Sequence, residues 1–379
     1  MEVFITVINL FGGLGLFLYG MKMMGDGLEN AAGDKLKGIF DRITSNPVKG
    51  VLTGAIVTAI IQSSSATTVM IVGFVNAGLM NLYQATSVIM GANIGTTVTA
   101  QIVSFKLEAI APVALGIGII LYLFSKKQRT KEFATILLGF GILFTGMEFM
   151  KDAVKPLSEY EGFRQSLIYF GKHPLLGILA GFAITGIIQS SSASMGMLIA
   201  LASQGLIPLS AALPILYGDN IGTCVTSLIS SIGASRNTKR AATMHLTFNV
   251  IGTIIFVLVL NYPITKFVTW LDPTDAARQI ANAHTIFNVV NVLILLPFAK
   301  YIVKLVLKMM PITEEESEAT VRTKYLDERI LQTPSIALGN TMKEVIRMGD
   351  KANRALEASM DSLLNKSMES VKKTEKHEE

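Results

Sequence analysis

The stretch GAIVTAIIQSSSATTVMIVGF at residues 54–74 places the tetrad Gln-Ser-Ser-Ser in the middle of an uncharged, apolar segment. A second copy of the tetrad stands 127 positions later, in GFAITGIIQSSSASMGMLIAL at residues 181–201. A further phrase follows each copy at the same distance, GANIGTTVT at 91–99 and GDNIGTCVT at 218–226. The chain therefore contains a duplicated unit, and the duplication keeps polar residues where a membrane helix normally has few.

The duplication extends beyond these phrases. Aligned without a gap, residues 47–100 and 174–227 are identical at 24 of 54 positions. Upstream, glycines also match, at an offset of 126 residues, so the two copies share more than the tetrads. The matching pairs are Gly13 with Gly139, Gly15 with Gly141, and Gly20 with Gly146.

Composition places the chain among membrane proteins. Half of its 379 residues are apolar, 16% are charged, and the mean hydropathy is +0.49. Residues 50–105 and 173–218 carry no formal charge, and each segment holds several membrane elements because a spanning helix needs about 20 apolar residues. The net charge of +5 is ordinary for a membrane protein and predicts no nucleic-acid partner. Four scattered histidines and the single Cys224 form no catalytic triad or metal cluster, so enzyme chemistry is not expected.

The lengths of the apolar segments predict an all-α membrane protein. Residues 50–80 are too long for one upright helix and too short for two crossings, which favours a re-entrant hairpin with residues 62–65 at its tip. Residues 82–105 form a span that the polar and glycine residues of 91–97 are expected to break. The other predicted elements are spans at 3–24, 109–125, 133–150, 241–260 and 280–303, an amphipathic stretch at 35–43 and a second one after the span at 133–150, a hairpin at 175–206 and a broken span at 209–232.

The number of crossings predicts how the two copies are oriented. The first repeat, residues 1–127, crosses the membrane three times, so the second repeat, residues 128–310, enters it upside down. Inverted-topology repeats with discontinuous helices are typical of secondary transporters. Basic residues are about twice as frequent in the loops of one side, which include 235–240 and 300–308, and this excess places the N-terminus outside and the C-terminus inside.

Residues 311–379 have a different character. Thr313 and Glu316 form a capping box, and a helix is expected to begin at Thr333 and Pro334. Apolar residues then recur at helical spacing, which predicts the opening helix of a bundle that is cut short. The seam consists of Leu338, Met342, Val345, Ala352, Leu356, Ser359 and Leu363.

The paired tetrads are the candidate substrate site. Serines inside membrane helices often serve only close packing, but identical tetrads at two symmetry-related tips favour a binding role. A half-helix that begins inside the membrane exposes backbone N–H groups with a positive dipole end, and neighbouring hydroxyls add neutral donors. The candidate substrate-binding residues are Gln62, Ser63, Ser64, Ser65, Gln189, Ser190, Ser191, Ser192, Asn93 and Asn220.

The same groups supply oxygen ligands for an alkali cation. No Arg or Lys lies in residues 50–105 or 173–218, so a buried anion there needs mobile cations beside it, which favours symport. The candidate sodium residues are Gln62, Ser65, Thr96, Gln189, Ser192, Thr223 and Asp219.

Several of these residues have a plainer interpretation. Asn93, Asn220, Thr96, Thr97 and Thr223 could equally be helix caps at a break. Asp219, a deep acid, is predicted to bind an additional sodium or carry a proton, with a surface position as the alternative. His245 and His284 open the matching phrases HLTFNVIG and HTIFNVVN, and we interpret both as packing residues first and proton carriers second.

The doubled QSSSA, with GANIGT and GDNIGT and then HLTFNVIG, resembles the type II sodium–phosphate cotransporter family in its bacterial branch, over residues 5–305. The resemblance implies sodium-coupled symport of inorganic phosphate by alternating access, with sodium ions as the coupling ions, in a multi-pass protein of the bacterial inner membrane. It implies binding at the two tetrads, and a PhoU-like domain beginning near Tyr325. Asp219 departs from the family, which usually has a neutral residue there.

Other functions use the same features. A phosphate exporter or channel would need the same anion cradle, and a membrane phosphate sensor could signal through residues 311–373. A homodimer is left open. So is the orientation, because animal members of the family place the connection between the repeats outside the cell.

Overall fold

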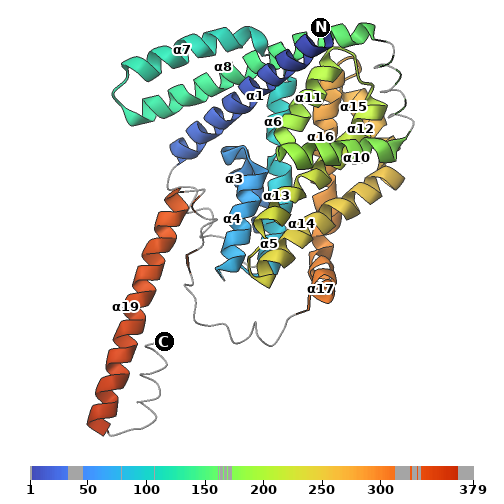
Figure 1. Cartoon of the computed structure of the whole chain (residues 1–379). Helices are drawn as coiled ribbons and strands as arrows, with labels where there is room; N and C mark the ends of the chain where they lie inside the picture. The colour runs from blue at the N-terminus through green and yellow to red at the C-terminus, as the bar shows by residue number, and fades with distance from the viewer. Residues whose placement is uncertain are drawn as a thin grey trace.

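The structure is a computed structural model that describes residues 2–32, 46–77, 79–105, 107–160, 162, 165, 169, 173–311, 325–326, 331 and 334–365. Within these ranges every regular element is a helix (Figure 1). The predicted amphipathic stretch at 35–43 and the capping box at Thr313 and Glu316 lie outside the described residues.

The helices follow the repeat. The first repeat contains α1 (Glu2–Ala32), α3 (Pro47–Ile61), α4 (Ser64–Asn76), α5 (Leu82–Gly95), α6 (Thr97–Ser104) and α7 (Ala111–Phe124). The second contains α8 (Gln128–Val154), α10 (Pro174–Ile188), α11 (Ser191–Ser203), α12 (Leu209–Gly222) and α13 (Cys224–Ser230). They are followed by α14 (Arg236–Ile255), a π-helical turn (Phe256–Leu260), α15 (Asn261–Leu271), α16 (Ala276–Leu295), α17 (Ala299–Met309) and α19 (Pro334–Asn365).

Both predicted hairpins break at their tetrads. Helix α3 ends just before Gln62 and α4 begins at Ser64, while α10 ends just before Gln189 and α11 begins at Ser191. Helices α3 and α5 run parallel, because later residues of α5 contact later residues of α3. A Cβ added at Gly91 would lie 2.0 Å from the carbonyl oxygen of Val51, and one at Gly95 would meet the backbone further along α3. The chain must therefore return through α4, which confirms the hairpin.

The second repeat packs in the same way. A Cβ added at Gly218 would lie 1.9 Å from the carbonyl oxygen of Ile178, and one at Gly222 would meet Phe182 and Thr185. These glycines therefore lie inside α12 and bring it against α10. The predicted break within residues 91–97 is confirmed, since α5 continues through Gly91, ends at Gly95 and is followed by α6 from Thr97.

The first helices of the two repeats, α1 and α8, pack against each other backbone to backbone (Figure 1). A Cβ added at Gly20 would lie 2.7 Å from the carbonyl oxygen of Gly139, and one at Gly146 would lie 2.7 Å from that of Gly13. Earlier residues of α1 thus meet later residues of α8, so the helices are antiparallel. Equivalent helices that run in opposite directions are what inverted repeats require.

The helices α14 and α16 take equivalent places in the two halves. Helix α14 packs against α4, α5, α12 and α13, whereas α16 packs against α11, α12, α5 and α6. Because α4, α5 and α6 of the first repeat correspond to α11, α12 and α13 of the second, the neighbours of α14 are the equivalents of the neighbours of α16. The largest cluster of buried apolar side chains lies among α1, α8, α11, α12 and α16, and it includes Phe17, Phe144, Tyr217 and Phe287.

Four described segments are long and apolar enough to cross a membrane: Ile5–Ala32, Gln128–Leu157, Arg236–Leu271 and Ala276–Met309. A fifth candidate is the bent pair of Leu82–Ser104 and Glu108–Phe124, whose axes meet at 76°. The predicted separate span at 109–125 is therefore a helix of 14 residues, which at about 1.5 Å per residue falls short of a bilayer of about 30 Å.

Two basic segments that we expected to be loops are mostly helical. Residues 300–308 lie in α17, and α14 begins at Arg236. Arg240 is fully buried and donates hydrogen bonds to the carbonyl oxygens of Met310 (2.8 Å) and Pro311 (2.7 Å). This side chain holds the end of α17 against α14, so Arg240 should not be counted among the loop charges that indicate membrane orientation.

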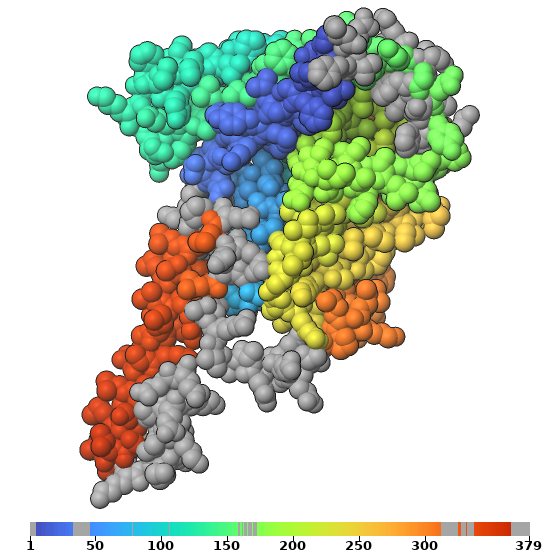
Figure 2. Space-filling view, viewed as in Figure 1, coloured from blue at the N-terminus to red at the C-terminus, as the bar shows by residue number. Residues whose placement is uncertain are grey.

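Helix α19 begins at Pro334 as predicted and projects from the rest of the molecule (Figures 1 and 2). The predicted apolar seam is largely exposed along it, with Leu338, Met342 and Leu363 each more than half accessible. The predicted division of the chain into 1–127, 128–310 and 311–379 stays a prediction.

Candidate functional site

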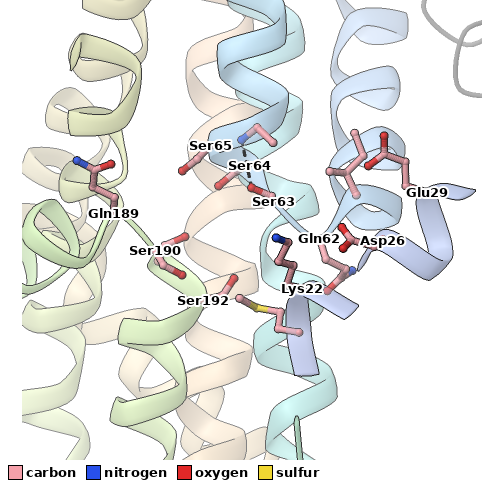
Figure 3. Close-up of a pocket in the computed structure, with 14 residues that line it drawn as sticks. Lys22, Asp26, Glu29, Gln62, Ser63, Ser64, Ser65, Gln189, Ser190 and Ser192 are labelled. Carbon is pink, nitrogen blue, oxygen red and sulfur yellow. Dashed lines mark hydrogen bonds between the residues drawn. The ribbon is translucent and has the colours of Figure 1, made fainter. Parts of the chain in front are cut away.

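A cavity of about 500 Å³ lies between the two hairpin tips (Figure 3). Both tetrads line it, so the structure brings together two segments that are 127 positions apart in the sequence. The lining consists of Gln62, Ser63, Ser64, Ser65 and Ala66 from the first tip, Gln189, Ser190, Ser191 and Ser192 from the second, Ile61, and four residues of α1.

The glutamine of each tetrad has an unusual backbone. Gln62 has φ of 58° and Gln189 has φ of 56°, and they are the only described non-glycine residues with positive φ. Each ends its helix in the left-handed conformation and donates its N–H to a carbonyl one turn back, that of Thr58 (2.8 Å) or Thr185 (2.7 Å). Residues other than glycine adopt this conformation at a cost, and such residues often occur at functional sites.

The first serine of each tetrad caps the next helix. The Oγ atom of Ser63 accepts a hydrogen bond from Ala66 N (3.1 Å), and that of Ser190 accepts one from Ala193 N (3.2 Å). The backbone amides between the capping serine and the donor are not used by this bond, and the residues that carry them line the cavity: Ser64, Ser65, Ser191 and Ser192. In the described part of the chain the hydroxyls of the other tetrad serines make no hydrogen bond: Ser64, Ser65, Ser191 and Ser192.

The two glutamine side chains differ. Gln62 is buried, its Nε2 donates to the carbonyl oxygen of Ala59, and its Oε1 accepts from Thr99 Oγ1 (2.9 Å). Gln189 is exposed, and the residue equivalent to Thr99, Thr226, has a buried Oγ1 without a partner among the described residues.

The remaining predicted residues do not line the cavity. Asn93 donates to Asn249 Oδ1 (3.0 Å), and its Oδ1 lies 3.1 Å from His245 Nε2. Asn220 donates to a carbonyl of its own helix, as does Thr223, and Thr96 is buried at the break between α5 and α6. Asn93 thus joins α5 to α14, and a role for these four residues at the tetrads stays a prediction.

Asp219 lies one layer behind the second tip. It is 1% exposed, so the alternative of a surface position is wrong. Its Oδ1 accepts a hydrogen bond from Thr185 Oγ1, and Thr185 also accepts the N–H of Gln189. Its Oδ2 is buried and makes no hydrogen bond of good geometry among the described residues, although the Ser194 hydroxyl of α11 lies close to the carboxylate. At this position the carboxyl group needs either a bound cation beside its ionised form or a proton that makes it neutral.

Helix α1 brings charge to the cavity, which we did not expect. Lys22, Asp26 and Glu29 all line it. We expected the first span to end near residue 24, but α1 continues to Ala32. Lys22 is exposed, but it brings a cation of the protein itself to the cavity, and the inference that a buried anion would find none stays a prediction. The signal in the sequence was the spacing of these three charges at i, i+4 and i+7, which places them on one face of a helix.

His245 and His284 have different surroundings. His245 lies 3.3 Å from Ser227 Oγ and 3.1 Å from Asn93 Oδ1, which agrees with a packing role. Both ring nitrogens of His284 are buried without a partner in the described part of the chain. The position equivalent to Ser227 in the first repeat is Ala100, which has no hydroxyl to offer.

Comparison with known proteins adds independent information. The sequence pattern of the Na+/Pi-cotransporter family matches residues 16–152 and 147–290. The chain is 32% identical over 295 residues to the "Uncharacterized protein YqeW" of Bacillus subtilis, across 78% of this chain and 95% of that protein. It is 28% identical to the "Putative inorganic phosphate export protein YjbB" of Escherichia coli K12, across 98% of this chain and 67% of that protein.

A more distant group of relatives matches over a shorter segment. The "Sodium-dependent phosphate transport protein 2A" of Rattus norvegicus is 40% identical over 97 residues, which are 25% of this chain and 15% of that protein. No solved structure matches the chain significantly.

Proposed function

The chain belongs to the Na+/Pi-cotransporter family, and on that premise we propose that it carries inorganic phosphate together with sodium ions by alternating access. The family is one of phosphate transporters and not of enzymes. The proposed substrate site is the cavity between the two tetrads, and the proposed location is the inner membrane of a bacterium.

The observation that carries this proposal is that both tetrads line one cavity of about 500 Å³. The N-termini of α4 and α11 meet there, and each brings a positive dipole end and unused amides. The hydroxyls of Ser64 and Ser191, which make no hydrogen bond within the part of the chain that the structure describes, add neutral donors at the same wall. A tetrahedral oxyanion accepts many hydrogen bonds, so this set of donors suits phosphate.

Sodium coupling is supported by the chemistry of the surrounding oxygen atoms. Sodium prefers hard oxygen ligands, and serine hydroxyls, glutamine carbonyls and carboxylates all surround the two tips. Asp219, with one buried oxygen that makes no hydrogen bond of good geometry within the described residues, is the candidate for a bound cation or a proton. The antiparallel packing of α1 and α8 supports inverted halves, between which the cavity could open to either side of the membrane in turn.

The test is transport by purified protein in liposomes. We expect labelled phosphate to accumulate under an inward sodium gradient and not under an equal potassium gradient. Equal uptake in potassium would contradict sodium coupling. Uptake that only equilibrates, without accumulation, would indicate a channel.

Export is the second candidate, and the names of the YjbB relatives favour it. In symport phosphate enters together with sodium, whereas in sodium-driven export phosphate leaves as sodium enters. Liposomes loaded with phosphate and given an inward sodium gradient separate the two, because loss of internal phosphate driven by entering sodium would indicate exchange. Deleting the residues after Pro311 tests the sensor alternative, since a transporter should keep its activity.

A further inference from the structure

We propose that Lys22 of α1 is the charged group that binds the phosphate anion in the cavity. This inference rests on the proposed function, because it assigns a ligand contact within the same site. Neither tetrad contains a charged residue, so a charge at the cavity must come from another element.

Close packing fixes α1 against the first tip. A Cβ added at Gly25 would lie 2.8 Å from the carbonyl oxygen of Ile61 and 3.5 Å from Gln62 Cβ. Helix α1 therefore passes directly beside the turn at Gln62. Lys22 lies about one helical turn before Gly25, which places it on the cavity wall.

The side chain of Lys22 is available for a ligand. In Figure 3 it extends into the space between Ser63 and Ser192, one from each tip. It makes no ion pair or hydrogen bond within the described part of the chain, although Asp26 follows four positions later on the same helix. An ammonium group has three donors, and all of them are free here.

The charges of the cavity suit a dianion with accompanying cations. Two helix N-termini supply roughly half a positive charge each, and Lys22 supplies one more, which together roughly match a phosphate dianion. Asp26 and Glu29 line the same cavity and carry two negative charges when ionised. Their carboxylates would repel phosphate unless cations occupy the cavity with it, so they link anion binding to sodium.

The test compares Lys22→Met, which keeps most of the side-chain volume, with Lys22→Arg, which keeps the charge. We expect Lys22→Met to raise the phosphate KM by about ten- to a hundredfold with a smaller change in kcat, because a charge-assisted hydrogen bond is lost. Lys22→Arg should recover most of the affinity. Lys49→Met is the matched control, since Lys49 is exposed as Lys22 is but does not line the cavity, and it should leave KM unchanged.

A second measurement does not depend on transport. Stabilisation of the detergent-solubilised protein against heat by inorganic phosphate, in sodium, should weaken in Lys22→Met and persist in Lys49→Met. Asp26→Asn should have the opposite effect and strengthen phosphate binding at low sodium. The unfolding temperature without phosphate reports whether each variant is folded.

The outcomes separate the two proposals. If Lys22→Met leaves phosphate affinity unchanged while Gln62→Ala removes it, the cavity is the site and the role of Lys22 is overturned. A loss of kcat at unchanged KM would also overturn it, because it would indicate a role in conformational change. If neither Lys22→Met nor Gln62→Ala affects phosphate binding, the proposed site itself fails.

Discussion

The two hairpin tips have the same backbone and different side-chain surroundings. Gln62 and Gln189 share a left-handed conformation within 2° in φ, and the serine after each caps its helix in the same way. Yet the Gln62 side chain is buried and bonded to Thr99, whereas Gln189 is exposed. The two repeats thus share the backbone conformation and helix caps of the tips, while the side-chain contacts of the two glutamines differ.

The buried residues next to each tip also differ in charge between the two repeats. In the second repeat Thr185 donates to Asp219. In the first repeat the equivalent positions hold Thr58 and Ala92, and Thr58 Oγ1 has no partner among the described residues. The two tips therefore differ, because only the second has a carboxyl group, that of Asp219, buried next to it. Two halves that bind the same anion can in this way respond differently to cations.

The largest expected effect tests the part that the repeats share. Gly91→Ala and Gly218→Ala would each place a Cβ about 2 Å from a backbone carbonyl oxygen, which cannot move without separating two helices. We expect each change to cost more than about 3 kcal/mol, beyond the usual range of overpacking, and to abolish folded protein. Gly12→Ala is the control, since no atom lies within 4 Å of its added Cβ. Yield and thermal unfolding of the solubilised protein measure the difference, and normal unfolding of Gly91→Ala would contradict this packing.

The glutamines test where the repeats differ. Gln62→Ala and Gln189→Ala should each lower phosphate transport at least about tenfold, because both line the cavity. Only Gln62→Ala should also lower the free energy of unfolding, by about 1–2 kcal/mol, since it loses buried hydrogen bonds. Transport assays and thermal unfolding give the two numbers. Equal loss of stability in both variants would contradict the difference between a buried, hydrogen-bonded Gln62 and an exposed Gln189.

Asp219 tests the difference in charge between the two tips. Asp219→Asn keeps an acceptor for Thr185 and removes the charge, so we expect folding to survive and the sodium or pH dependence of transport to flatten. The reverse change, Ala92→Asp, should not reproduce the effect, because the first tip is held differently. Initial transport rates over a range of sodium concentrations and pH values provide the measurement. Unchanged profiles in Asp219→Asn would leave the neutral groups and α1 as the whole site.

The smallest expected effect concerns the histidines. Helix α6 packs against α16, so by the symmetry of the repeats we expect Ala100→Ser to offer His284 the hydroxyl that Ser227 offers His245, with a gain of about 1 kcal/mol in stability. Ser227→Ala should cost about the same amount. Both changes are measured by thermal unfolding, with Ala114→Ser on α7 as a control for added hydroxyls. A loss of stability in Ala100→Ser would mean that the site is too tightly packed for the oxygen atom.

Much of the membrane architecture was predictable because it depends on local sequence. The breaks at Gln62 and Gln189, and those at Thr96 and Thr223, follow from polar residues and caps within apolar segments. Helix ends were less predictable. The first span was expected to end near residue 24, and no local signal stops α1 before Ala32.

The sequence by itself determined the duplicated unit, the helical hairpins and the chemistry of the tetrads, because each depends on residues that are neighbours along the chain. Only the tertiary structure decided what surrounds them. Glycines at Gly25, Gly91 and Gly218 allow backbones to approach so closely that contacts depend on how whole helices are placed. For that reason Lys22 reaches the tetrads while Asn93 joins α14, although Asn93 is closer to the first tetrad in sequence.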